Sequence, residues 1–299
     1  MGEAVSIGLV FQGAHRLMGA LASAFKEGTV LRLQDLGELG GELLVFGGPY
    51  SNLQATRALM AEARTRGIPA SNCICTGDVV AYCADAVASI AAIRDFGCRV
   101  VAGNCEKQLA EGAADCGCGF EVGTTCDVLS AGWYGHANTQ IGGQDRAWMA
   151  DLPDVIRFTW QGQRVAVLHG GATNVARFLW PVSPEEAGFA EEIRALESLS
   201  GPVDIVLAGH CGIAFAREVD GRRWINAGVI GMPPHDGRAE TRFAILSGSG
   251  AVFHRLGYDH QAARAAMVQA GLTQGYQDSL QTGVWPSEDV LPKEMRRGG

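Results

Sequence analysis

The stretch from residue 73 to residue 106 constrains the fold of this chain more than any other. One apolar run ends in the loop TGD (76–78) and a second ends in the loop GNCE (103–106), with apolar residues at helical spacing between them. A strand–helix–strand crossover of this length brings both strand ends to the same edge of a parallel sheet. Ligands of open α/β sheets bind at that edge, so Asp78 and Asn104 are expected to meet there. Their carboxylate and amide oxygens are hard donors that suit a divalent cation.

The composition excludes several classes of partner. The 299-residue chain has a formal net charge of −8, which argues against a nucleic-acid partner or an anionic membrane surface, because both require clustered Lys and Arg. A small anionic ligand remains compatible, since a bound metal ion supplies local positive charge. The start of the sequence shows neither a basic signal region nor an uninterrupted apolar span, so we expect a cytoplasmic protein that does not enter a membrane.

The nine cysteines are odd in number and irregularly spaced. This pattern indicates a reducing compartment with free or metal-bound thiols instead of a disulfide framework. One group, which could hold structural zinc or an iron–sulfur cluster, consists of Cys105, Cys116, Cys118 and Cys126. A single CxC differs from the CxxC pairs of zinc knuckles, so burial as small apolar residues is the favoured interpretation.

Strand and helix patterns alternate early in the chain and give way to antiparallel strands later. A helix is predicted at about 107–114 and a hairpin over 214–227. This order predicts two packed sheets with helices outside them, in one main domain over 41–299. Residues 1–40, with a helical pattern over 17–25, are expected to form an N-terminal extension. The extension packs on the main domain or on another subunit, which leaves a homo-oligomer open.

Five polar loops follow apolar runs in the order GGPYSN (47–52), TGD, GNCE, LHGG (168–171) and AGHCG (208–212). Together they resemble the loops of the calcineurin-like metallophosphoesterases, and most of all those of the small bacterial and archaeal phosphodiesterase branch. The resemblance extends from about residue 42 to about residue 290. It implies an α/β fold, a four-layer α/β/β/α sandwich with the site at the carboxyl ends of the strands.

The resemblance implies that one of the family's two metal sites is intact. The positions that match the ligands of this second site are Asp78, Asn104, His169 and His210. Asp78 matches the aspartate that the family shares between both metals. Taken singly, such residues are more often turn or structural residues, but four ligand residues in the correct order favour metal binding. Two oxygen and two nitrogen donors suit Mn²⁺, Fe²⁺ or Zn²⁺ better than Ca²⁺.

The first of the two sites has lost its own ligands. Gly48 and Tyr50 stand where the family has an aspartate and a histidine, and Gly212 stands where it has a last histidine. Only the shared Asp78 remains, so the resemblance implies one metal ion and not two. Tyr50 is expected to fill the space of the lost histidine, with a phenolate ligand to Fe³⁺ as the alternative.

The leading hypothesis is a metal-dependent phosphoesterase that hydrolyses phosphodiesters or phosphomonoesters with one ion and weak or altered activity. A single ion can act as a Lewis acid but cannot clamp the attacking and leaving oxygens from both sides. The expected catalytic residues are Asp78, Asn104 and Cys105. Cys105 replaces a histidine near the leaving group and is a poor proton donor. The residues expected to contact a small phosphorylated substrate are Tyr50, Asn52 and His136.

The alternative is a catalytically silent relative that binds a nucleotide or a phosphorylated metabolite in a regulatory role and signals through a partner. One local feature separates the two hypotheses. An enzyme requires an open coordination position that faces solvent, whereas a silent relative has Tyr50 or Cys105 in that position.

Overall fold

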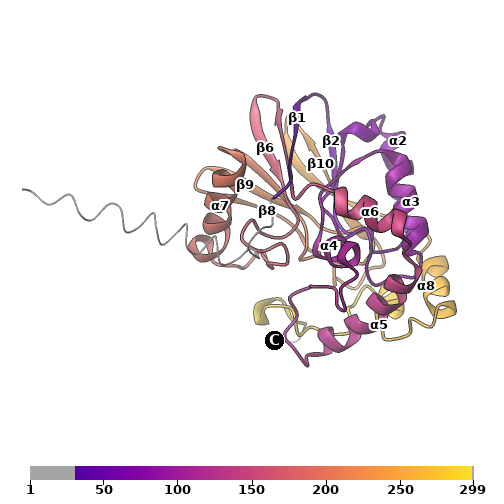
Figure 1. Ribbon diagram of the computed structural model, residues 1–299. Coiled ribbons are helices and arrows are strands. Elements are labelled where there is room, and N and C mark those ends of the chain that lie inside the picture. Colours follow the sequence, from indigo (N-terminus) through magenta and orange to yellow (C-terminus); the bar gives the residue numbers. More distant parts are fainter. Residues whose placement is uncertain (1–30, 298–299) are drawn as a thin grey trace, which may run out of the picture. The chain divides into compact units, whose positions relative to one another are not determined.

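The computed structural model describes residues 31–297, which contain two β-sheets (Figure 1). The strands of the six-stranded sheet are, in spatial order, β1 (Leu33–Leu39), β5 (Val155–Trp160), β6 (Gln163–Val167), β7 (Ile205–Ala208), β9 (Arg222–Ala227) and β8 (Ala214–Val219). Those of the five-stranded sheet are β11 (Gly250–Leu256), β10 (Thr241–Ser247), β2 (Leu43–Phe46), β3 (Cys73–Cys75) and β4 (Arg99–Val100). Both sheets mix parallel and antiparallel pairs.

The two sheets pack face to face around one apolar core. Val45 and Ile74 of the five-stranded sheet and Val167 and Leu207 of the six-stranded sheet belong to the same buried cluster. All four residues of β2 are buried, as expected for a strand that is covered on both faces. The inner strands of both sheets are therefore held rigidly, which fixes where their ends lie.

Helices cover the outer face of each sheet (Figure 1). Those on the five-stranded sheet are α2 (Leu53–Thr65), α3 (Ala86–Phe96) and α8 (His260–Gln269). α7 (Glu191–Ser200) lies on the six-stranded sheet behind a π-helical turn, Glu185–Ala190. The turn's Phe189 ring lies 5.5 Å from the ring of Trp224 on β9. The described chain therefore confirms the expected four-layer α/β/β/α sandwich.

The other helices surround the loops at the strand ends. They are α4 (Asn104–Glu111), α5 (Thr125–Gln140), α6 (Gly143–Asp151) and α9 (Tyr276–Thr282), with 3-10 turns at Ala70–Asn72 and Lys293–Met295. The helix predicted at about 107–114 begins three residues earlier, at Asn104, where the carboxylate of Glu106 accepts a hydrogen bond from the backbone N–H of the N-cap residue Gly103. It ends at Gly112, whose φ of +67° terminates the helix. The shift places Asn104 in the first turn of α4.

β1 lies in a segment that the sequence assigns to the N-terminal extension. It pairs in parallel with β5, from Leu33 opposite Val155 to Leu39 opposite Trp160. This part of the expected extension is therefore an edge strand of the six-stranded sheet. The helix predicted over 17–25 lies outside the described residues, and the domain boundary after residue 40 stays a prediction. Within residues 31–297, no helix combines the length and the apolar character that crossing a bilayer requires.

Candidate metal centre

Four strand ends bring the predicted metal ligands to one edge of the sandwich. β2, β3 and β4 run parallel to each other, as do β6 and β7. Asp78 follows β3, and Asn104 follows β4 as the first residue of α4. His169 follows β6 and His210 follows β7. The topology thus brings Asp78 and Asn104 together, as the 73–106 stretch predicts. It places the imidazoles of two histidines beside them.

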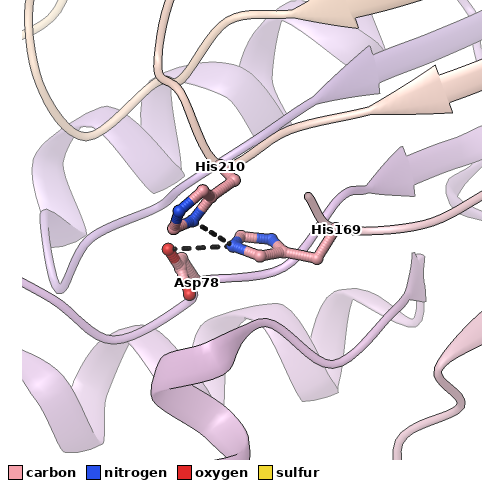
Figure 2. Close-up of side chains that lie close together, drawn as sticks. All are labelled: Asp78, His169 and His210. Atoms are coloured by element: carbon pink, nitrogen blue, oxygen red, sulfur yellow. Dashed lines mark hydrogen bonds and ion pairs between the residues drawn. The ribbon is translucent and has the colours of Figure 1, made fainter. Parts of the chain in front are cut away.

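The ring nitrogen Nε2 of His169 is the centre of this group (Figure 2). It lies 3.2 Å from Oδ2 of Asp78 and 3.1 Å from Nδ1 of His210. It also lies 3.1 Å from Oδ1 of Asn104. Asp78, His169 and His210 are the one group of His, Cys, Asp or Glu side chains that could hold a metal ion among the residues described. These three side chains and that of Asn104 are all buried.

The hydrogen bonds of His169 indicate which of its ring nitrogens faces the other three donors. Nδ1 of His169 lies 2.6 Å from the carbonyl oxygen of Thr76, so this nitrogen carries the proton and donates it. In the neutral ring Nε2 then presents a lone pair to the lone pairs of Asp78, Asn104 and His210. Four converging lone pairs repel each other unless a cation lies among them. The donor set therefore fits a metal ion.

The spacing of the donor atoms fits the same interpretation. Ligands about 2.0–2.2 Å from one ion, at tetrahedral or octahedral angles, are separated from each other by about 2.8–3.6 Å. The distances from Nε2 of His169 to the other three donors, 3.1–3.2 Å, lie in this range. The donor atoms of Asp78, His169 and His210 all lie within 4.8 Å of one another.

The pKa values of the group reflect its burial and its mutual attraction. Burial lowers the pKa of His169, but the attraction of Asp78 outweighs it, and the net pKa is raised. Burial likewise raises the pKa of Asp78, and the attraction of His169 reverses this to a net decrease. Burial, with the neighbouring His169, lowers the pKa of His210 to about 3. His210 is thus a neutral imidazole, which is the form that binds metals.

Neighbouring groups orient the ligands. Nδ2 of Asn104 donates to the carbonyl oxygen of Cys116 at 2.9 Å, which turns Oδ1 toward His169. Asp78 and His210 both have left-handed backbones, with φ of +56° and +63°. Such conformations cost non-glycine residues of order 1–3 kcal/mol and tend to cluster at functional sites. The loops are therefore held in place by their surroundings instead of by local preference.

Glu106 is a functional residue to which the sequence reasoning assigned no role. Its fully buried carboxylate accepts hydrogen bonds from the backbone N–H groups of Asp78 at 2.8 Å, Gly103 at 2.9 Å and Val80 at 3.3 Å. Burial and the charge of Asp78 raise the pKa of Glu106 to about 7. The capping-box position after Gly103 was the signal that could have identified it. Glu106 ties the loop after β3 to the loop after β4.

The Tyr50 ring lies against Gly48, one of the positions where the sequence departs from the family's pattern. A Cβ atom at Gly48, where the family has an aspartate, would lie 2.5 Å from the Tyr50 ring. At Gly212, where the family has its last histidine, the nearest side chains are those of Trp285 and Val229. Burial and then the charge of Asp78 raise the pKa of Tyr50 well above its usual value. The two interpretations of Tyr50, as a filler and as a phenolate ligand, stay predictions.

The remaining predicted residues have structural partners. Cys105 is buried, its backbone N–H donates to Oδ1 of Asp78 at 3.3 Å, and burial raises the pKa of its thiol. Asn52 caps α2 by accepting from the N–H of Ala55, while its Nδ2 donates to the carbonyl oxygen of Gly231. His136, on α5, lies 3.2 Å from the carbonyl oxygen of Ala84. The catalytic role of Cys105 and the substrate contacts of Asn52 and His136 stay predictions.

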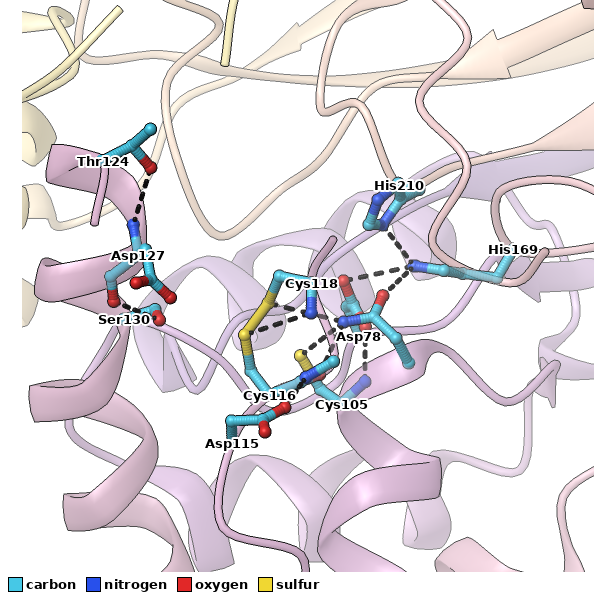
Figure 3. Close-up of a disulfide and its surroundings, with 12 residues drawn as sticks. Asp78, Cys105, Asp115, Cys116, Cys118, Thr124, Asp127, Ser130, His169 and His210 are labelled. Atoms are coloured by element: carbon cyan, nitrogen blue, oxygen red, sulfur yellow. Dashed lines mark hydrogen bonds and ion pairs between the residues drawn. A yellow bond between two sulfur atoms is a disulfide. The ribbon is translucent and has the colours of Figure 1, made fainter. Parts of the chain in front are cut away.

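Two cysteines beside the ligands form a disulfide (Figure 3). Cys116 and Cys118 are bonded to each other, and the other seven cysteines are free. The expectation of thiols without disulfides is wrong for this pair, because the left-handed Gly117 turns the chain and brings the two residues to a Cα separation of 5.3 Å. The alternative four-cysteine cluster is not formed in the described part of the chain.

A cavity adjoins the metal group at His210, and we call it the aromatic pocket. The cavity is small, with a volume of about 50 Å³. The aromatic side chains that line it include Tyr50, Tyr82, Phe178, Trp180, Tyr276 and Trp285. The Phe178 ring lies 4.2 Å from the His210 ring, so one wall of the pocket touches the metal group directly.

Two packed sheets with a buried Asp/His group at their strand ends define a domain of the metallophosphoesterase type. The chain belongs to the calcineurin-like phosphoesterase superfamily, whose domain model matches residues 50–249. This membership confirms the resemblance seen in the loops. Proteins of this family use metal ions, and the Asp/His group is the place in the described chain that could hold one.

Two solved structures illustrate the likeness. A hypothetical protein from Pyrococcus horikoshii OT3 shares 16% identity with a TM-score of 0.67, covering 82% of this chain and 99% of that one. A metallophosphoesterase from Sphaerobacter thermophilus shares 19% identity with a TM-score of 0.61, covering 82% of this chain and 100% of that one. At these identities the likeness shows the fold alone. No curated protein matches the sequence.

Proposed function

We propose that the protein is a metal-dependent phosphoesterase that works with one divalent ion. The observation that carries this proposal is the convergence of four donors on one point, with Nε2 of His169 within 3.2 Å of each of the others. Two oxygen and two nitrogen donors favour Mn²⁺, Fe²⁺ or Zn²⁺. Family membership supplies the reaction class, hydrolysis of a phosphoric ester.

The residues of the chain prepare the site in distinct ways. When bound, a divalent ion supplies Lewis-acid chemistry and promotes the ionisation of water. His169 is held in the tautomer with a free Nε2 by Thr76, and Asn104 is aimed by the carbonyl oxygen of Cys116. Glu106 holds the loop that carries Asp78 against the loop that carries Asn104. These contacts place all ligands before substrate arrives, which is the condition for electrostatic stabilisation without reorganisation.

The same site supports low activity. With the first site filled by Tyr50, one ion remains. A single ion cannot stabilise the attacking and the leaving oxygen from both sides, as two ions do. Cys105 stands where a proton donor to the leaving group is needed, but it is a buried thiol with a raised pKa and donates only weakly. Loss of a general acid reduces rates by about 10²–10⁴-fold. We propose accordingly that good leaving groups are hydrolysed and poor ones are not.

The test begins with elemental analysis of protein purified without added metal. The protein is then loaded with Mn²⁺ or Zn²⁺ and assayed with bis(4-nitrophenyl) phosphate and 4-nitrophenyl phosphate. Asp78→Asn removes the charged ligand with almost no change of shape. Asp95→Asn is the matched control, because Asp95 is an exposed residue of α3 away from the site.

The proposal expects about one metal ion per chain and metal-dependent hydrolysis in wild type and Asp95→Asn, with both lost in Asp78→Asn. Equal metal content and equal rates in wild type and Asp78→Asn would refute it. Two ions per chain would refute the single-ion part alone.

The catalytically silent relative is a second candidate that one observation favours. The four ligands are almost enclosed, with Asp78 5% and Asn104 1% exposed, and Tyr50 closes the side where the first site would be. In this case the metal-loaded protein binds a nucleotide or a phosphorylated metabolite and hydrolyses nothing. Calorimetric titration with AMP alongside the hydrolysis assay separates the two candidates.

A small phosphorylated compound is the proposed ligand under both candidates. A homo-oligomer and a cytoplasmic location stay predictions. Light scattering of the purified full chain measures the first, and localisation of a tagged full chain measures the second.

A further inference from the structure

The Cys116–Cys118 disulfide lies against the predicted ligand Asn104, and no chemistry proposed so far uses the bond between the two sulfurs (Figure 3). Nδ2 of Asn104 donates to the carbonyl oxygen of Cys116 at 2.9 Å. It also lies 3.5 Å from Sγ of Cys118 and 3.5 Å from Sγ of Cys105, whose thiol is free. Three cysteines thus surround the amide of one ligand.

The disulfide acts on its own turn more than on the fold. It closes a loop that contains one residue, Gly117. A cross-link that restricts the unfolded chain stabilises a fold less as the closed loop becomes shorter, so this bond contributes little in that way. Within the turn, the N–H of Gly117 donates to Oδ1 of Asp115 at 2.8 Å, and that of Cys118 donates to Sγ of Cys116 at 3.3 Å. The bond therefore fixes where the Cys116 carbonyl oxygen lies.

The turn belongs to the segment 112–124, which joins α4 to α5 and contains no helix or strand. The two bonded cysteines are 3% and 6% exposed, but Asp115 and Gly119 on either side of them are exposed to solvent. Irregular surface segments are the parts of a fold that open most readily. The disulfide thus lies just beneath such a segment, where a small local opening exposes it to a reductant.

Reduction of the pair changes what holds Asn104. A dithiol supplies two electrons and two protons: the bond between the sulfurs of Cys116 and Cys118 breaks, each sulfur becomes a thiol, and the dithiol becomes a disulfide. Two thiol sulfurs cannot stay at bonding distance, so the turn opens and the Cys116 carbonyl oxygen loses its fixed place. The amide of Asn104 then keeps only sulfur partners, which are weak acceptors. Its Oδ1 is no longer aimed at the ion position.

We infer that Cys116 and Cys118 form a redox-active site that sets how tightly the metal centre holds its ion. The oxidised pair holds Asn104 in place as a ligand, and the pair reduced by a dithiol releases it. This inference rests on the proposed function for the ion but not for hydrolysis. The coupling is reciprocal, because an ion that prefers the oxidised protein also makes the disulfide harder to reduce.

The experiment measures Mn²⁺ binding to the full-length protein by calorimetry, in the oxidised and in the reduced form. Mn²⁺ is the probe because thiols, as soft ligands, bind it weakly. The reduced form is prepared with dithiothreitol, which is removed by anaerobic desalting. Titration of denatured samples confirms seven thiols in the oxidised form and nine in the reduced form. Hydrolysis of bis(4-nitrophenyl) phosphate by both forms is measured in parallel.

The double variant Cys116→Ser, Cys118→Ser cannot form the bond. Cys98→Ser is the matched control, because Cys98 is a half-buried free cysteine at the end of β4 away from Asn104. Circular dichroism confirms the folding of each variant. A second measurement needs no variant: the midpoint potential of the wild-type disulfide is determined in dithiothreitol redox buffers, with and without saturating Mn²⁺.

The oxidised protein is expected to bind Mn²⁺ about 10- to 100-fold more tightly than the reduced protein, which is the usual effect of losing a group that orients a ligand. The double variant should bind like the reduced protein and ignore dithiothreitol, whereas Cys98→Ser should keep the full response. Mn²⁺ should make the midpoint potential about 30–60 mV more negative, which is the same fold-change for a two-electron couple. Equal affinity in both forms with an unmoved midpoint would overturn the inference, as would a response to dithiothreitol that persists in the double variant.

The parallel assay separates this inference from the proposed function. Mn²⁺ binding that depends on the disulfide, without hydrolysis in either form, sustains the redox site and refutes the enzyme. Hydrolysis together with Mn²⁺ binding that ignores the disulfide refutes the redox site alone. No Mn²⁺ binding in either form refutes both.

Discussion

Replacing Gly103 with alanine tests whether close approach of two loops builds the metal group. Gly103 has φ of −83° and ψ of 176°, which any residue can adopt, so the effect of the substitution is steric alone. A Cβ atom there would lie 2.3 Å from Oδ1 of Asp78, 2.7 Å from its backbone nitrogen and 2.9 Å from Oε2 of Glu106. Carbon–oxygen contacts are normally about 3.5 Å, so the Asp78 loop must move by roughly 1 Å.

The magnitude follows from what that movement disrupts. Overpacking of a rigid site costs about 1–3 kcal/mol. Loss of one of the two hydrogen bonds that Glu106 Oε2 accepts, from Asp78 or from Gly103, adds about 1–2 kcal/mol. The expected loss in the free energy of unfolding is therefore about 2–5 kcal/mol. Displacing a ligand or its support typically weakens metal binding by about 10- to 100-fold, and we expect a change of this size.

Gly135→Ala is the matched control. Gly135 lies exposed in α5, has no atom within 4 Å of its would-be Cβ, and has no positive φ. Alanine should stabilise this helix by about 0.5–1 kcal/mol. Urea unfolding and calorimetric titration with Zn²⁺ measure both variants. If Gly103→Ala unfolds like the control and keeps wild-type metal affinity, the close-approach reasoning is refuted.

Three further predictions concern other contacts of the described chain. Glu106→Gln keeps the shape of the side chain but replaces one accepting oxygen with an NH₂ group that faces a backbone N–H. The free energy of unfolding, measured with urea, should fall by about 1–3 kcal/mol. An unchanged free energy of unfolding would contradict the role given to the carboxylate. Because Cys116 and Cys118 are bonded, denatured protein without reductant should titrate seven thiols, and nine only after reduction; nine at the outset would contradict the disulfide. The hydrogen bond and charge of Arg164 lower the pKa of Asp204 to about 2, below its usual value near 4. The stability that this pair provides is thus present above about pH 4 and lost as the pH falls toward 2, and since the pair is solvent-exposed it should amount to less than about 1 kcal/mol. In Asp204→Asn the free energy of unfolding should fall less steeply between about pH 4 and pH 2 than in wild type. The same fall in both proteins would show that the pair contributes nothing.

The sequence, with its resemblance to the family, was sufficient to predict the sandwich and the meeting of the four candidate ligands. Asp78, Asn104, His169 and His210 each follow a buried apolar run, and strand ends in a parallel arrangement share an edge whatever the distance between them in sequence. The order of the motifs then fixed which loops belong together. The meeting of Asp78 with Asn104 follows from local patterns and topology, whereas the roles of His169 and His210 came from the resemblance to the family.

Features that depend on contacts between distant side chains were not predictable in the same way. Glu106 reads as an ordinary capping residue until the Asp78 loop is seen to lie on it. The aromatic pocket draws Tyr50, Phe178 and Tyr276 from three remote segments, and no spacing in the sequence joins them. The Cys116–Cys118 bond depends on the conformation of Gly117, which composition does not reveal.

The parallel pairing of β1 has a consequence for the order in which the protein is made. Arg157 on β5 donates a hydrogen bond to the carboxylate of Asp35 on β1, and it lies 122 positions later in the sequence. On the ribosome, at about 5–20 residues per second, β1 must wait roughly 6–25 s before its partner has been synthesised. The rest of the sheet can assemble without it, because β1 lies at the edge. β1, the earliest strand among residues 31–297, is therefore expected to be among the last to dock.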